Sequence, residues 1–348
     1  MDKWVIEEVS ASVQVNCHIS DARHGTEYGM CTYLMKMREY FRWEKGLGFS
    51  ARLGNEEVGT WLAEREELWA GMEGWDFQPV KVTGRQLDPL EDAPINAALD
   101  EFGLVYSGGL GNYGRPHFFL GELERRERHT DHVLFVVGRE LARDLASPPA
   151  MTRGDTIYVR RESLRRLLWE KLENWRWSKP DNPLGRAFAC YDFNNDLEGS
   201  LERMTDHEID IVVLHEQGER QAGKLLGERW ERMLLDLGRT PGELAARAAR
   251  DHLADCIVTI PKLAEAADTP ALHFYVGNLS AMRKMLFPHL RQAYDLWLAS
   301  GELDHLVRAA EVGREHWTWM VRSMLELHEQ YGPQAAEPVA RLAEDHRL

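Results

Sequence analysis

The chain has 348 residues and carries 57 Asp and Glu against 42 Lys and Arg, a formal net charge of -15 at pH 7. Such a negative field repels phosphate backbones and anionic lipid heads, which excludes nucleic acid and membrane as expected partners. No uncharged apolar run approaches the roughly 20 residues that span a bilayer, and the chain does not start with a basic and apolar leader. We therefore expect a soluble, cytoplasmic protein, with its four widely spaced cysteines reduced.

The first 75 residues predict helices. Residues 4–19 fit a helix or a strand by periodicity, and the lack of alternation at the start favours the helix. A break at Gly25 follows, and Thr26 can cap a helix that continues to Glu44. Residues 56–72 predict another helix, after which glycines and prolines mark a boundary.

The character changes in the middle of the chain, where short β-type runs occur at 104–106, 117–123, 133–137 and 156–159. A small sheet is expected there, with one helix at 139–145 lying on it. Residues 108–114 contain the spelling G-x-G-x-x-G, but Pro116 follows where a dinucleotide fold needs a helix, so a hairpin tip is predicted. Tyr113, Arg115 and His117 are candidates there for a lid or an anion contact.

From residue 162 onward almost every segment reads as helix, including 215–237 and 241–260. The acidic run at 191–198 partly has the spacing of a calcium loop, but its glycine falls at 199, so we interpret it as a loop and helix cap. The predicted fold is mainly α, a helical bundle-like body with a small α/β insert, and α+β overall. The predicted domains are N-terminal helices at 1–75, the insert with its glycine-rich hairpin at 76–160, and a C-terminal helical body at 161–348.

Ionisable side chains interrupt the apolar stripes of two predicted helices. Along 215–237 the stripe leads back to Glu219 and then to His215 and Glu216. Along 241–260 an alanine-rich face leads to His252 and Asp255, which lie three residues apart and share a face. A buried carboxylate is normally paired, protonated or bound to a metal. The alternative is that the first helix end emerges into solvent, where acids favour the helix dipole.

A third pair, His24 with Glu27, has the same spacing near the start of the chain. Histidine and carboxylate pairs from several helices are the ligand chemistry of an iron or manganese site in a helical bundle. The candidate metal ligands are His24, Glu27, His215, Glu216, Glu219, His252 and Asp255, with Glu219 and Glu27 as the candidate catalytic residues. The order His before Glu differs from the Glu-x-x-His pattern of di-iron proteins, and a mononuclear site is equally compatible.

These residues predict a metal-dependent enzyme, a non-haem iron or manganese oxidoreductase that acts on a small organic substrate. The alternative is a non-catalytic binding or regulatory protein whose buried His and acid pairs form a structural polar network. A third hypothesis is acid/base catalysis by a His and carboxylate pair without a metal. The sequence does not define the oligomeric state, and spacing alone does not show that the three pairs converge.

Overall fold

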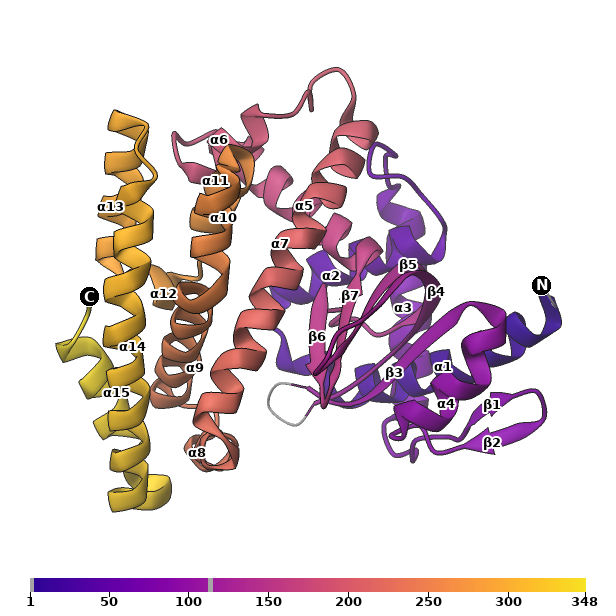
Figure 1. Ribbon diagram of the computed structural model, residues 1–348. Coiled ribbons are helices and arrows are strands. Elements are labelled where there is room, and N and C mark those ends of the chain that lie inside the picture. Colours follow the sequence, from indigo (N-terminus) through magenta and orange to yellow (C-terminus); the bar gives the residue numbers. More distant parts are fainter. Residues whose placement is uncertain (1–2, 112–114) are drawn as a thin grey trace. The chain divides into compact units, whose positions relative to one another are not determined.

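The computed structural model describes residues 3–111 and 115–348, and the chain divides into two compact units. The first unit contains the chain up to Lys171 together with Asp196–Thr205, and the second contains Leu172–Asn195 and Asp206–Leu348. The fold is α+β and mainly helical, as predicted, with a five-stranded sheet and a two-stranded ribbon (Figure 1).

The first unit is built on a five-stranded sheet with the strand order β3-β4-β5-β7-β6, in which only β5 and β7 pair in parallel. The strands are β3 (Leu104–Leu110), β4 (Pro116–Arg128), β5 (Val133–Arg143), β6 (Ala150–Arg153) and β7 (Thr156–Arg160). A separate two-stranded ribbon pairs β1 (Val80–Val82) with β2 (Arg85–Leu87). β3 and β4 form the predicted hairpin, but Tyr113 lies outside the described residues.

Helix α1 (Lys3–His24) lies against β4 and β5, which confirms the helical interpretation of its sequence. Its apolar face, Val5, Val9 and Val13, shares a core with Tyr106 and Phe118 of the sheet. The other helices of this unit are α2 (Met30–Glu44), α3 (Asn55–Met72) and α4 (Asp92–Leu99), with short turns η1 (Gly25–Glu27) and η2 (Asp100–Phe102). The predicted start of α2 at Thr26 is wrong, because that residue lies in η1.

The helix expected at 139–145 is also wrong, because these residues continue strand β5 to Arg143. The pairing of β4 with β5 shifts register around Gly121, which is typical of a β-bulge. A Cβ at Gly121 would lie 2.3 Å from a methyl carbon of Val137, so only glycine fits. Local propensity for a helix is overridden here by pairing with β4.

The second unit is all helical. Helix α5 (Arg161–Ser178) and helix α7 (Leu197–Leu226) each contribute their later residues to it. Its remaining elements are α6 (Pro183–Ala189), α8 (Glu228–Leu237), α9 (Pro241–Ala254), η4 (Asp255–Thr259), α10 (Ile260–Ala266), α11 (Thr269–Asn278), α12 (Ala281–Leu286), α13 (Pro288–Ser300), α14 (Asp304–Tyr331), η5 (Gly332–Ala335) and α15 (Ala336–Asp345). The turn η4 is a π-helix that continues α9.

Helix α9 is central to this unit because its alanine-rich face lets neighbouring helices approach closely. It contacts α14, α15 and α12, and a Cβ at Gly242 would lie 2.2 Å from the Ala336 carbonyl oxygen. The single helix predicted for 215–237 is wrong, since Gly227 has a φ of 67° and separates α7 from α8. No helix in the described part of the chain is long and apolar enough to cross a membrane.

Candidate functional site

The predicted pair of His24 and Glu27 lies in the first unit, at the end of α1 and in the turn η1. His24 Nδ1 and Glu27 Oε1 are 2.9 Å apart, and Arg115 donates a hydrogen bond to the other Glu27 oxygen at 2.7 Å. The Arg115 guanidinium also lies 4.7 Å from the centre of the Tyr28 ring. Glu27 and Arg115 thus form a partly exposed ion pair, which connects the turn after α1 to the residue before β4. The other flagged residue of the hairpin, His117, places its Nδ1 3.0 Å from Asp144.

The remaining five predicted residues belong to the second unit, and three of them meet. His215 of α7 places its Nδ1 2.8 Å from Oδ1 of Asp255, the first residue of the π-helical turn η4. The other ring nitrogen lies 3.2 Å from Oε1 of Glu219, one turn further along α7. Two helices that are adjacent in space therefore bring an imidazole and two carboxylates together, in a cluster that we call the Asp255 cluster.

Arginines neutralise both carboxylates of the Asp255 cluster. Arg250 lies 2.9 Å from Oε2 of Glu219, and Arg283 donates a hydrogen bond to Oδ2 of Asp255. Asp255 is fully buried and accepts hydrogen bonds from four side chains: His215, Thr259, Tyr275 and Arg283. Charge-assisted hydrogen bonds of this kind are the strong ones, so the cluster holds α7, η4, α11 and α12 together.

These pairings decide the protonation of the cluster. Burial would raise the pKa of Asp255, but Arg283 and then His215 hold it far below its usual value. Burial also opposes ionisation of Glu219, yet Arg250 and then His215 lower its pKa to about 2. For His215 the effect of burial is outweighed by the Asp255 carboxylate, so its pKa rises well above the usual value. At neutral pH an imidazolium therefore lies between two carboxylates.

The other two predicted residues have separate environments. His252 is fully buried, its Nε2 lies 3.0 Å from the Arg283 carbonyl oxygen, and its ring stacks on Trp317 at 4.8 Å. Because a carbonyl only accepts, Nε2 carries the proton. Burial and the charge of Arg283 lower the pKa of His252 to about 3, so the ring is neutral. Glu216 is buried on α7.

Within residues 3–111 and 115–348, no group of three or more His, Cys, Asp or Glu side chains is arranged to hold a metal ion. An ion at the Asp255 cluster would have to displace Arg250 and Arg283 from the carboxylates that they neutralise. His24 and Glu27 belong to a different unit from this cluster. The iron or manganese site therefore stays a prediction.

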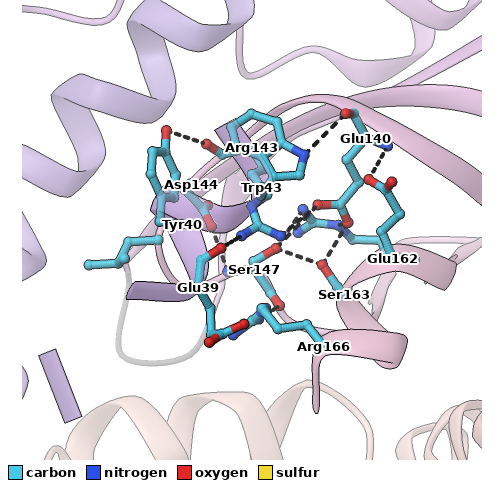
Figure 2. A network of polar contacts seen from close by, with 12 residues as sticks. Glu39, Tyr40, Trp43, Glu140, Arg143, Asp144, Ser147, Glu162, Ser163 and Arg166 are labelled. Atoms are coloured by element: carbon cyan, nitrogen blue, oxygen red, sulfur yellow. Dashed lines mark hydrogen bonds and ion pairs between the residues drawn. The ribbon is translucent and has the colours of Figure 1, made fainter. Parts of the chain in front are cut away.

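A second polar cluster, in the first unit, was not singled out by sequence (Figure 2). We call it the arginine network, and its members are Arg42, Arg143, Arg160, Arg166, Glu39, Glu140, Ser147 and Ser163. Glu140 is the hub, because its Oε1 accepts hydrogen bonds from Arg160 Nε at 2.8 Å and from Ser163 Oγ at 2.6 Å. Its other oxygen lies 3.6 Å from Arg143. All four arginines and both glutamates are buried.

The arginine network is braced by aromatic rings and by the chain around Ser147. The Arg143 guanidinium lies 4.8 Å from the centre of the Trp43 ring and 5.6 Å from that of Tyr40, which are cation–π distances. Arg166 donates hydrogen bonds to the Ser147 carbonyl and to Glu170, both at 2.8 Å. These contacts join α2, β5 and α5 in one polar core.

Burial and charge act against each other in this network. Burial would raise the pKa of Glu140, but Arg160 and then Arg143 hold it below its usual value. Burial lowers the pKa of Arg143 to about 10, although Glu140 opposes the shift. Burial, and next the charge of Glu140, raise the pKa of Glu162, whose Oε2 accepts a hydrogen bond from the Glu140 backbone. Burial thus favours the neutral form of Glu162, and the charged form of Glu140 is kept by its arginines.

Several donors of these arginines have no partner among the described residues. The buried atoms are Nε of Arg143, Nη1 of Arg160, Nε of Arg165 and Nε of Arg166. A buried donor without a partner destabilises a protein by about 1–3 kcal/mol, so each calls for an explanation. Arg143 ends β5, Arg160 ends β7, and Arg165 and Arg166 lie on α5.

A cavity of about 260 Å³ adjoins the arginine network. Four arginines, two aromatic rings and three glutamates contribute to its lining: Arg42, Arg143, Arg165, Arg166, Trp43, Phe49, Glu39, Glu162 and Glu198. Glu39 is paired with Arg42 and Arg38, and Glu198 with Arg165. Guanidiniums also lie against both aromatic rings of the lining. Arg42 and Arg165 are 5.8 and 5.5 Å from the centre of the Phe49 ring, and Arg143 is 4.8 Å from that of Trp43. The guanidiniums therefore dominate the chemistry of the cavity.

Residues 8–160 match the family model described as Family of unknown function (DUF6866) N-terminal domain, and residues 165–346 match the corresponding C-terminal domain. No curated protein and no solved structure matches the chain. These matches carry no activity, substrate or partner.

Proposed function

Because this chain belongs to the DUF6866 family, whose function is unknown, we propose from its own geometry that the first unit binds a small anionic ligand. The site is the cavity beside the arginine network. The alternative predicted from the sequence is also a non-catalytic binding or regulatory protein, but one whose buried His and acid pairs form a structural polar network. The ligand that we propose for the cavity carries a carboxylate or phosphate group.

The observation that supports the proposal is the collection of guanidiniums on one cavity, with buried N–H groups that lack partners. Guanidinium groups match carboxylates and phosphates in a planar, bidentate way and remain charged when buried. The chain as a whole carries a net charge of -15, so this cluster runs against the average field. A local positive site in an acidic protein is suited to a small anion and unsuited to a polyanion.

The size of the cavity limits the ligand. About 260 Å³ lies just below the roughly 300–1,000 Å³ of drug-sized ligand pockets, so a compact molecule fits best. Burial raises the pKa of Glu162, which reduces the opposition of this carboxyl to an anion in the cavity. A small carboxylic acid or an inorganic phosphate satisfies the limit on size.

Isothermal titration calorimetry with inorganic phosphate and with malonate tests the proposal, alongside the Arg165→Ala variant. Arg165 is the cavity arginine chosen because its side chain is 28% exposed, so truncation is compatible with folding. Arg161→Ala is the matched control, since Arg161 lies on the same helix and pairs with Glu202 without lining this cavity. Losing a hydrogen bond to a charged group is worth about 1.5–3 kcal/mol, so Kd should weaken by roughly tenfold or more in the first variant only.

Binding of neither probe, or equal losses in the two variants, would contradict the proposal. Thermal unfolding of each variant without ligand shows whether the fold persists. A ligand that binds should also raise the melting temperature of the wild-type protein, because it stabilises only the folded state.

The metal-dependent oxidoreductase predicted from the sequence remains the second candidate, placed at the Asp255 cluster. The meeting of His215, Glu219 and Asp255 favours it, since these are iron and manganese ligand types. Elemental analysis of the untagged protein and of Glu219→Ala tests it. Near-stoichiometric iron or manganese that disappears in the variant supports oxidative chemistry on a small organic substrate. Unchanged metal content with a lowered melting temperature favours a structural polar network.

A further inference from the structure

Tyr191, His207 and Asp268 form a hydrogen-bonded chain in the second unit. The Tyr191 hydroxyl lies 3.0 Å from His207 Nδ1, and His207 Nε2 lies 2.6 Å from Asp268 Oδ2. Tyr191 lies between α6 and α7, His207 on α7, and Asp268 is the N-cap of α11. Three separate segments thus place a hydroxyl, an imidazole and a carboxylate in line.

The chemistry of Tyr191, His207 and Asp268 determines which atom donates and which accepts in each of the two hydrogen bonds. An ionised carboxylate only accepts, so when the imidazole acts as a base its proton is at Nε2, and Nδ1 accepts the hydrogen bond from the tyrosine hydroxyl. A hydroxyl, a base in contact with it, and a carboxylate that orients the base together make the arrangement of an activated nucleophile. We propose that Tyr191 is a nucleophile for acyl transfer, with His207 as its base and Asp268 as the positioning residue.

The hydrogen-bonded group of Tyr191, His207 and Asp268 is accessible from solvent. The side chains of His207 and Asp268 are 33% and 23% exposed, and Tyr191 is half-buried. Burial, and next the carboxyl of Glu208, raise the pKa of Tyr191, so the phenol keeps its proton until the base removes it. This is general-base activation during attack, in contrast to a preformed phenolate.

The surroundings select the class of substrate. Glu208, next to His207 in the chain, is 1% exposed, and neither of its carboxyl oxygens has a partner among the described residues. Asp192 adjoins Tyr191 in the sequence, and the Asp268 carboxylate lies beyond His207. Burial, and next Asp268, raise the pKa of Glu208 well above its usual value, so the negative charge near the phenol comes from the two aspartates, and it repels phosphate esters and carboxylates. The substrate of this site is therefore an uncharged acyl donor, such as a carboxylic ester.

The step balances within these groups. The tyrosine oxygen attacks the carbonyl carbon and forms a C–O bond while its proton moves to His207 Nδ1. The bond from that carbon to the leaving group breaks, and the proton passes from His207 to the leaving group. Water then attacks the acyl-tyrosine with His207 again as the base, which releases the acid and restores the phenol. No oxidant, reductant or cofactor takes part in this sequence.

Asp268 also has a structural role that the test must separate. Its Oδ1 accepts a hydrogen bond from the Ala271 backbone at 3.1 Å and caps α11. Asparagine is an equally good N-cap residue, so Asp268→Asn keeps the cap and removes the charge that positions His207. This variant separates the cap from the proposed chemistry.

Acetylation by N-acetylimidazole, an uncharged acyl donor, tests the proposal when it is measured site by site with mass spectrometry on the full chain. Tyr331, which is 43% exposed and belongs to the same unit, is the internal reference. Without activation, the more exposed Tyr331 reacts faster. With a general base, which contributes about 10²–10⁴-fold, Tyr191 reacts at least tenfold faster than the reference.

His207→Gln should bring the rate at Tyr191 down to that of Tyr331 or below, and Asp268→Asn should lower it by a smaller factor. The rate at Tyr331 should stay constant in both variants. Tyr191 reacting no faster than Tyr331 in the wild-type protein overturns the proposal, whatever the folding of the variants. An unchanged acetylation rate at Tyr191 in folded His207→Gln overturns the proposal as well. Such a result would mean that the hydrogen bonds of Tyr191, His207 and Asp268 only hold α11 in place. This inference concerns the second unit and goes beyond the anion site proposed for the first.

Discussion

Replacing Asp255 by asparagine removes a buried negative charge while nearly keeping the side-chain volume. Asp255 is fully buried, and its oxygens accept hydrogen bonds from four side chains. An amide keeps one acceptor oxygen and turns an NH₂ group toward donors. In the variant the guanidinium of Arg283 and the imidazolium of His215 lose the carboxylate that neutralises them both.

The expected loss follows from the burial of these charges. Removing one partner of a buried ion pair destabilises a protein by about 3–5 kcal/mol, because a charge is left without compensation. For a domain of 150–250 residues, 1 kcal/mol corresponds to about 2–4 °C, so the melting temperature should fall by roughly 6–20 °C. The pKa of Asp255 lies below the usual value of an unfolded aspartate, so its contribution is present above that value and is lost only as the pH falls through the folded pKa.

Scanning calorimetry at pH 7 measures the fall, with Glu265→Gln as the matched control. Glu265 is an exposed carboxylate of α10 that pairs with Lys262, and the same change there should leave the transition in place. A fall in melting temperature of less than about 2 °C in Asp255→Asn, or a fall as large in the control, would refute the reasoning. It would mean that the cluster is more hydrated than its burial indicates.

Two further predictions concern the second unit. Gly218→Ala should lower the free energy of unfolding in urea by about 1–3 kcal/mol, because the added carbon would lie 2.6 Å from the Ala254 carbonyl oxygen. Gly223→Ala, on the same helix, adds a carbon that meets nothing within 4 Å, so it should raise the free energy of unfolding by about 0.5–1 kcal/mol. Equal effects of the two changes would contradict this. Burial, and next Asp268, raise the pKa of Glu208 well above its usual value. The buried carboxyl therefore destabilises the folded protein increasingly as the pH rises from the pKa of the unfolded state toward that of the folded state. Glu208→Leu should raise the melting temperature more at pH 8 than at pH 5. A larger gain at pH 5 would reverse the sign of this argument.

The sequence was most informative where one regular element buries one face. The spacing of Val5, Val9 and Val13 is satisfied by α1 against the sheet, and the alanine-rich face of α9 packs against its neighbours as the composition indicated. The same periodicity picked out His215, Glu219 and Asp255, since each residue lies where an apolar stripe becomes ionisable, and the structure brings these three together. Which helices face each other was not encoded in that spacing.

The arginines that complete both clusters could not be predicted in the same way. Arg283 reaches Asp255 from a short helix far along the chain, and spacing gives no information on such a contact. Glu140 and Arg143 fall in the segment that was predicted as a helix, whereas in the structure they lie on β5, which pairs with β4 through a bulge, and both side chains are buried. The arginine network depends on this tertiary register, which local patterns do not contain.

The two charged clusters differ in what they leave available to a ligand. In the Asp255 cluster both oxygens of each carboxylate are matched by donors from the protein, so a ligand or ion must break existing pairs before it gains new ones. In the arginine network, buried donors of Arg143 and Arg166 have no match among the described residues, and the guanidiniums line a cavity. A ligand that pairs with the unmatched donors of the arginine network gains their hydrogen bonds directly, whereas the matched pairs of the Asp255 cluster oppose binding through desolvation. Anion binding at the arginine network therefore requires less rearrangement than metal binding at the Asp255 cluster.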